Sequence, residues 1–198
     1  MTIALKANAL ITKAELDVFL QTTLDSDYAN LLINSASDRI EKFCNRKFIL
    51  ATYTDEAYDG NGKCDLYLKN FPIVAITAFK EWDSYNNVVS YTFAEHTEYI
   101  VYKIEGYIHI RGRLGNGKDI YRVTYSAGYA IADVPYDLKK ACADLCSFYN
   151  INKDKIGIQS ESIGQYSYQL ANKTDGFERF GMPPEIGRTL NHYRNQNL

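Results

Sequence analysis

The segment Phe43-Cys-Asn-Arg-Lys-Phe48 separates two hydrophobic patterns that decide the fold class. Before it, apolar residues recur every three or four positions, which predicts a one-faced helix from Ser26, as its cap, to about Cys44. After it, from about Phe48 to Tyr125, the period becomes two, and β-branched and aromatic residues are frequent. The chain is therefore predicted to change from helix to short antiparallel strands at this segment.

The β part is predicted to contain several strands separated by glycine-asparagine turns. Two near-identical tetrapeptides, Gly60-Asn-Gly-Lys63 and Gly115-Asn-Gly-Lys118, each precede an Asp and a strand. Because Asn-Gly readily supplies the two positive φ angles of a tight hairpin, we expect a turn at both. The strands are expected near Tyr53–Tyr58, Cys64–Leu68, Ile73–Trp82, Tyr99–Ile104, Tyr107–Ile110 and Ile120–Tyr125.

Three further helices are predicted outside this part. Thr12-Lys-Ala-Glu15 has the spacing of a capping box and starts a short helix to about Leu20. Asp133 and Pro135 mark the start of a helix that runs to about Asn150, and Pro183 and Pro184 precede a last helix, Glu185 to about Tyr193. Residues 152–181 are polar and too long for an ordinary connection, so we expect an extended, functional segment.

These elements predict an α+β fold, in which a small helical bundle carries an antiparallel β insert between its first two long helices. The predicted parts are a helical core at 1–47 and 126–151, the β insert at 48–125, an extended assembly loop at 152–181, and a C-terminal helix and tail at 182–198.

Composition favours a soluble protein that acts through contacts. The chain has 198 residues with a net charge of -2, which argues against a protein that grips nucleic-acid phosphates. Its 17 tyrosines suit half-buried sheets and protein contact surfaces. No apolar run approaches the ~20 residues that cross a bilayer, so no membrane association is expected. Four cysteines and no signal segment indicate a reducing cytoplasm.

The motifs predict no catalytic, metal or cofactor site. Gly112–Lys118 fits most of a phosphate-binding loop, but Asp119 replaces the Ser or Thr that would hold magnesium, and a strand is predicted to follow. Cys142 and Cys146 could place two thiolates on one metal, although no further ligands complete the set and buried thiols explain them more simply. The three histidines are far apart, and His109 is expected to face solvent from its strand.

The order of several segments resembles the head-tail connector, adaptor or head completion proteins of tailed bacteriophages. The segments are Phe43–Phe48, Tyr58-Asp-Gly-Asn-Gly, Leu66–Ile76, Tyr121-Arg-Val-Thr-Tyr-Ser-Ala-Gly-Tyr129, Val134–Ala141, Ser160–Tyr168 and the helix after Gly-Met-Pro-Pro. The resemblance covers nearly the whole chain. It implies a structural virion protein of the neck, made in the host cytoplasm, that forms a dodecameric ring below the portal protein and joins the capsid vertex to a tail, stopper or tail-completion protein. Genome DNA would pass through the ring without specific binding.

Two groups of residues are candidates for contacts in such a ring. Ile186, Leu190 and Tyr193 form an apolar stripe on the last helix, and the resemblance implies that this helix contacts the portal. Tyr166, Tyr168 and Leu170 alternate with polar residues and no partner strand follows them, so they are candidates for addition to a neighbouring subunit's sheet, with a flexible surface loop as the alternative.

Two other classes of function stay open at this point. A carbohydrate- or protein-binding β module would also suit exposed aromatic residues, but a free-standing module does not need the flanking helices Asp27–Cys44 and Pro135–Asn150. A hydrolase without recognisable motifs is the third possibility, because carboxylates distant in sequence can meet in space.

Overall fold

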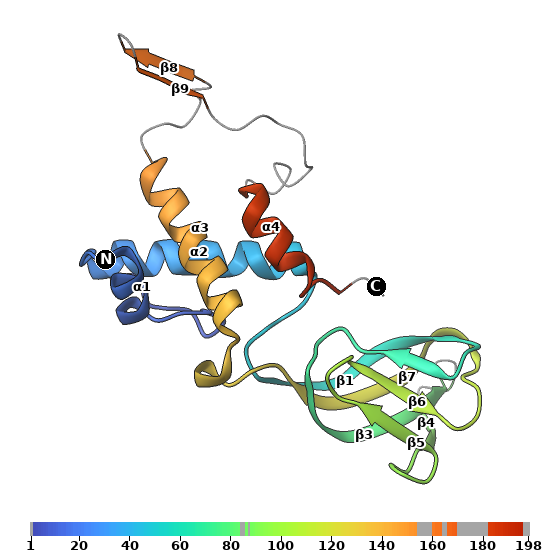
Figure 1. Ribbon diagram of the computed structural model, residues 1–198. Helices are drawn as coiled ribbons and strands as arrows, with labels where there is room; N and C mark the ends of the chain where they lie inside the picture. The colour runs from blue at the N-terminus through green and yellow to red at the C-terminus, as the bar shows by residue number, and fades with distance from the viewer. Residues whose placement is uncertain are drawn as a thin grey trace. The chain divides into compact units, whose positions relative to one another are not determined.

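The polypeptide folds as two units, which the computed structural model in Figure 1 describes at residues 2–83, 86, 88–153, 160–163, 166–169 and 182–195. The helical unit contains Met1–Cys44 and Pro135–Arg194, and the β unit contains Asn45–Val134 and Asn195–Leu198. The described residues form four α-helices and antiparallel sheets. The α+β class predicted from the sequence is therefore confirmed.

Side-chain caps start the first two helices. Thr12 Oγ1 accepts a hydrogen bond from the Glu15 backbone N at 3.2 Å, and Glu15 Oε2 accepts one from the Thr12 N at 2.7 Å. This is the predicted capping box, and it starts α1 (Lys13–Leu20). Helix α2 (Ser26–Cys44) is capped by Asp25, whose carboxylate accepts from two amides of the first turn at 3.0 and 3.1 Å. The prediction of a serine cap is wrong by one residue.

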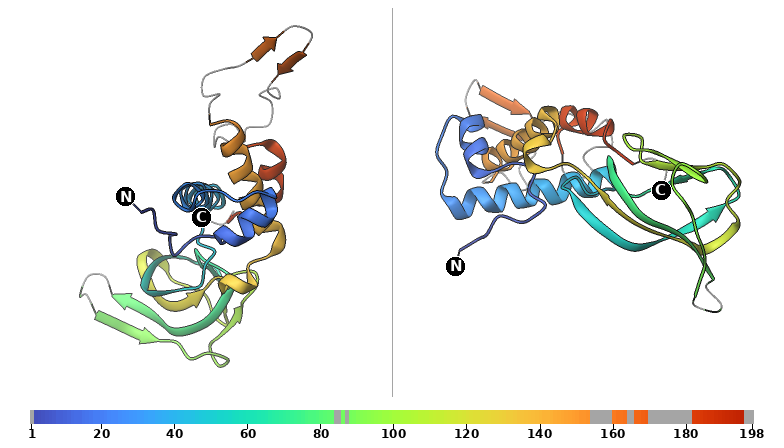
Figure 2. Two further views of the ribbon diagram at one scale, coloured as in Figure 1. Left: turned by 90° about the vertical axis from the view of Figure 1, so that its left-hand side faces the viewer. Right: turned by 90° about the horizontal axis from the view of Figure 1, so that it is seen from below.

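The other two helices complete the helical unit. Helix α3 (Tyr136–Ile151) crosses α2 and packs beside α4 (Pro184–Asn191), as Figures 1 and 2 show. Buried apolar residues from all four helices fill the space between them, including Leu16, Ile33, Ile40, Leu138, Leu145 and Leu190. None of the described helices is long and apolar enough to cross a membrane.

The N-terminal residues lie along α2 and are held there by its polar side chains. Lys6 N donates to Asn34 Oδ1 at 2.9 Å, and the Asn34 amide donates back to the Ala4 carbonyl at 3.0 Å. Asn8 Nδ2 donates to Glu41 Oε2 at 2.8 Å and so gives this buried carboxylate a hydrogen-bond partner. The polar face of α2 is therefore partly covered by the chain's own start.

The larger sheet of the β unit has four antiparallel strands. Their order across the sheet is β1 (Ala51–Asn61), β7 (Asn116–Ala127), β3 (Ile73–Asp83) and β4 (Val88–Thr92). Strand β7 is central, and every second residue in its second half is buried. This period of two places one face of β7 in the core and the other toward solvent.

A smaller sheet supplies the rest of the β core. Its order is β2 (Asp65–Tyr67), β6 (Tyr107–Ile110) and β5 (Tyr99–Tyr102). Leu66 and Ile108 are buried in the same cluster as Phe79 of β3, whose ring stacks on Phe93 at 4.4 Å between centroids.

The structure corrects the predicted turns. Gly115–Lys118 largely belongs to β7, and the two tetrapeptides pair across the sheet, with Gly60 opposite Gly117. In the first tetrapeptide only Gly62 has a positive φ, of 69°. Gly60 is required for a different reason, since a Cβ there would lie 2.1 Å from the Gly115 carbonyl oxygen. Strand β4 is not predicted by the sequence. The strand predicted after Gly112–Lys118 is confirmed, because β7 runs on to Ala127 where a phosphate-binding loop would be followed by a helix.

Candidate functional site

The predicted stripe on the last helix lies inside the helical unit. Ile186 is 6% exposed and Leu190 is 0% exposed, and the Leu190 carbonyl accepts a weak hydrogen bond from Cys44 Sγ at 3.6 Å. Tyr193 follows the helix, and its hydroxyl donates to Asp137 Oδ1 at 2.6 Å. The two aliphatic side chains therefore stabilise the protein's own core, which differs from the expectation that they face a partner.

The predicted strand in the long segment has a local partner. Strand β9 (Tyr166–Gln169) pairs with β8 (Ser160–Ile163), with Tyr168 opposite Glu161 and Tyr166 opposite Ile163. The interpretation of β9 as unpaired is wrong, because its partner strand precedes it in the chain. Leu170 lies outside the described residues.

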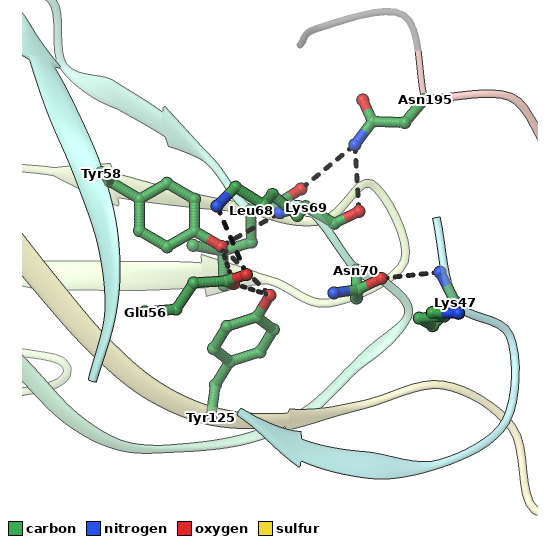
Figure 3. Close-up of polar contacts among 8 residues, drawn as sticks. All are labelled: Lys47, Glu56, Tyr58, Leu68, Lys69, Asn70, Tyr125 and Asn195. Atoms are coloured by element: carbon green, nitrogen blue, oxygen red, sulfur yellow. Dashed lines mark hydrogen bonds and ion pairs between the residues drawn. The ribbon is translucent and has the colours of Figure 1, made fainter. Parts of the chain in front are cut away.

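A largely buried polar network in the β unit joins strands β1 and β7 and one loop (Figure 3). The Glu56 carboxylate accepts from the hydroxyls of Tyr58 at 2.5 Å and Tyr125 at 2.7 Å, and these hydroxyls are 3.1 Å apart. The Lys69 backbone N donates a hydrogen bond to Tyr58 Oη at 3.1 Å, and the Lys69 ammonium group forms an ion pair with Glu56 at 3.4 Å. Every member of the network therefore has a partner, as buried polar groups require.

Burial keeps the phenols of this network neutral. It raises the pKa of Tyr58 well above its usual range, and the neighbouring Tyr125 hydroxyl and Glu56 carboxylate add to the shift. Burial likewise raises the pKa of Tyr125. Both hydroxyls thus act as hydrogen-bond donors to Glu56 at physiological pH, which is a structural role and provides no activated nucleophile.

The loop that carries Lys69 also binds Asn195, the last of the described residues. Asn195 is 5% exposed, and its Nδ2 donates to the carbonyls of Leu68 at 3.4 Å and Lys69 at 3.1 Å (Figure 3). On the other side of the loop, Lys47 N donates to Asn70 Oδ1 at 2.7 Å. Residues distant in sequence thereby fix the conformation of this loop. No pattern in the sequence predicts these hydrogen bonds of Asn195.

The smaller sheet presents a row of tyrosines on its outer face. Tyr67 and Tyr102 both lie opposite Tyr107 in the register, and all three are partly or fully exposed. The rings of Tyr102 and Tyr107 stack at 4.5 Å with an interplanar angle of 8°. This row is not predicted above, although the alternation of Tyr67 and Tyr107 with the buried Leu66 and Ile108 is the sequence signal for it. Exposed tyrosines of this kind suit a protein contact surface.

The cysteines and histidines are dispersed over the part of the chain that the structure describes. Cys142 and Cys146 are both 0% exposed, which confirms the interpretation as buried thiols, and their mutual hydrogen bond together with burial raises the pKa of Cys146. His109 is partly exposed, with Nδ1 2.6 Å from Asp65 Oδ1. Within the described ranges no three His, Cys, Asp or Glu side chains are grouped to hold a metal ion.

Comparison with known protein families identifies the family of this α+β chain. The head completion protein family matches residues 9–196, so the chain belongs to this family. It is therefore a structural protein of a phage-like virion, and its family is not one of enzymes. No curated protein matches the sequence.

Solved structures with a similar fold come from gene transfer agent particles. They are chains in the neck of an empty particle computed with C6 symmetry, in the neck of a native particle computed with C12 symmetry, and in the virion of the native particle. Their TM-scores are 0.55, 0.54 and 0.53 at identities of 14%, 15% and 16%, and the alignments cover 100% of this chain and 96%, 97% and 96% of theirs. At these identities the likeness shows a shared fold.

Proposed function

We propose that the protein is a head-tail connector subunit that forms a dodecameric ring below the portal protein and joins the capsid vertex to a tail or tail-completion protein. The observation that carries the proposal is membership of the head completion family across residues 9–196. The shared fold with chains from necks of C6 and C12 symmetry supports a ring.

In this proposal the helical unit is a small bundle that carries the β unit as an insert. The chain leaves the helical unit after Cys44 and returns to it at Pro135, which supports an insert between the two long helices. The proposal keeps two segments predicted from the sequence: residues 152–181 are the assembly loop, and residues 182–198 are the C-terminal helix and tail.

The proposed contacts use the last helix and the β8–β9 hairpin. Because Ile186 and Leu190 are buried in the helical unit, a portal contact by α4 would use its exposed side, where Glu185 and Asn191 lie, together with the partly exposed Tyr193. The β8–β9 hairpin, with Tyr166 and Tyr168, and Leu170 beyond it, would contact a neighbouring subunit. An isolated two-stranded hairpin is only marginally stable in water, which supports such a contact.

Genome DNA would pass through the ring without being gripped. The net charge of -2 gives no general attraction for a polyanion. Binding of the isolated protein to duplex DNA should therefore be undetectable near physiological salt. Micromolar binding with a steep salt dependence would contradict this part of the proposal.

Electron microscopy of virions or portal complexes tests the proposed function directly. A density for this chain as a ring between portal and tail is the expected result. Absence of the chain from the neck would refute the proposal, and a ring with another number of subunits would refute the dodecamer alone.

A further inference from the structure

An apolar groove between α1 and α3 is exposed on the helical unit. Its volume is about 400 Å³, and its walls include Val18 and Phe19 of α1 and Tyr136 and Ala143 of α3. The side chains of Val18, Phe19 and Tyr136 are 78%, 44% and 88% exposed. Contiguous large apolar side chains that stay exposed beside a groove indicate an interaction surface.

Two lysines that line this groove lie close to both carboxylates and aromatic rings. Lys139 Nζ lies 2.8 Å from Glu15 Oε1 and 5.9 Å from the centroid of the Tyr136 ring. Lys140 Nζ lies 2.7 Å from Asp144 Oδ2 and 5.6 Å from the centroid of the Phe19 ring. Each positive charge is thus already paired with a carboxylate within the unit, and each ammonium group lies within 6 Å of one aromatic ring of the groove.

A second groove, between α3 and α4, adjoins the first and is acidic. It has a volume of about 500 Å³, and Lys140 lines both grooves. Asp144 is compensated by Lys140, whereas Asp137 and Glu185 form no ion pair with any described residue. The surface around the apolar groove therefore has an excess of negative charge on its α4 side.

We propose that the two grooves together form the docking surface for one basic amphipathic helix of another virion protein. Its apolar stripe would lie in the α1–α3 groove, and its Lys or Arg side chains would point toward Asp137 and Glu185. A groove between two helices accepts residues at i, i+3, i+4 and i+7 of a third helix, and charge complementarity selects a basic one. That the helix belongs to another virion protein rests on the proposed function, whereas its basic and amphipathic character is inferred from the two grooves alone.

Two synthetic helical peptides of about 14 residues, roughly four turns, serve as probes. Both have the same Leu stripe, with Lys in one and Glu in the other at the polar positions. Binding of each labelled peptide to the full-length protein is measured by fluorescence anisotropy at about 0.15 M salt, where exposed charges are screened beyond ~8 Å. We expect the Leu/Lys peptide to bind about tenfold more tightly than the Leu/Glu peptide, which corresponds to about 1.4 kcal/mol.

Matched variants distinguish peptide binding in the groove from binding to any exposed apolar residue. Val18→Asp places a charge in the groove and should weaken the Leu/Lys peptide about tenfold. Ile151→Asp is the control, because Ile151 is also exposed, at 63%, but lies at the end of α3 and outside the groove lining. Glu185→Lys should weaken the Leu/Lys peptide and strengthen the Leu/Glu peptide. Circular dichroism checks that each variant is folded.

Three results would overturn the proposal. The first is equal affinity for the two peptides or no binding of the Leu/Lys peptide. The second is an equal effect of Val18→Asp and Ile151→Asp. The third is self-association of the wild type, seen by sedimentation, that Val18→Asp abolishes, because a second copy would then occupy the groove. None of these results depends on whether the chain is found in the neck, so failure of the docking surface is distinguishable from failure of the proposed function.

Discussion

Replacing Leu190 by Ala tests whether α4 belongs to the core of the helical unit. The Leu190 side chain is completely buried, and Ile186, one turn earlier, is almost so. Removing a fully buried Leu side chain loses apolar contacts and leaves a cavity, which lowers the free energy of unfolding by about 2–5 kcal/mol. That loss is a large part of the ~5–15 kcal/mol that stabilises a typical domain.

The loss is measurable by urea denaturation followed by circular dichroism at a helix-sensitive wavelength. With a urea dependence of about 2 kcal/mol per M, a loss of ~3 kcal/mol lowers the midpoint by about 1.5 M. Leu31→Ala is the matched control, because Leu31 lies on α2 of the same unit but is 47% exposed. We expect the control to change the free energy of unfolding by less than about 0.5 kcal/mol.

Equal midpoints for Leu190→Ala and Leu31→Ala would refute the reasoning. The stripe on α4 would then be available to a partner, as the sequence alone suggests. Deletion of residues 184–198 extends the test, since it removes the whole helix. We expect this truncated chain to have a destabilised helical unit, and a normally stable helical unit would contradict the structure.

Two further predictions concern the β unit, where Trp82, the only Trp of the chain, reports unfolding by fluorescence. Gly60→Ala should lower the free energy of unfolding by more than about 2 kcal/mol, because the added methyl group would clash with a backbone carbonyl, whereas Gly112→Ala, with nothing within 4 Å, should change it little. Burial raises the pKa of Tyr58 and Tyr125, so these phenols ionise near pH ~10 in the unfolded chain but remain neutral in the folded unit. The free energy of unfolding should therefore be unaffected by them below pH ~10 and should fall above it, by at most about 1.4 kcal/mol per pH unit for each tyrosine. Tyr58→Phe should reduce this fall, and an unchanged slope would contradict it.

Local signals in the sequence predict the helices well. The Thr12-to-Glu15 capping box and the period of three to four before Cys44 depend only on residues within one turn of each other. The change to a period of two after Phe48 likewise predicts a β part, since alternation is a property of each strand alone.

Contacts between distant residues are what the sequence does not reveal. The hydrogen bonds of Asn195 with the Leu68–Lys69 loop join residues more than a hundred positions apart, and no periodicity indicates them. The pairing of Gly60 with Gly117 is similar, because turn chemistry explains each Gly-Asn-Gly-Lys segment locally and only the register shows that they face each other. Strand β8 also escaped prediction, since Ser160-Glu-Ser-Ile163 has little of the β-branched and aromatic character that marks a strand.

The tyrosine surplus shows why composition alone is an incomplete guide to contact surfaces. Tyr58 and Tyr125 are buried and act as donors to Glu56, whereas Tyr67 and Tyr102 lie on the open face of the smaller sheet beside Tyr107. Both groups are included in the count of 17 tyrosines, but the register of each strand decides which face of the sheet a tyrosine occupies. A tyrosine in the core network cannot contact a partner without unfolding the β unit. Of these two groups, only the exposed row is therefore accessible to a partner, and the buried apolar residues behind it, such as Leu66 and Ile108, fix the face on which it lies.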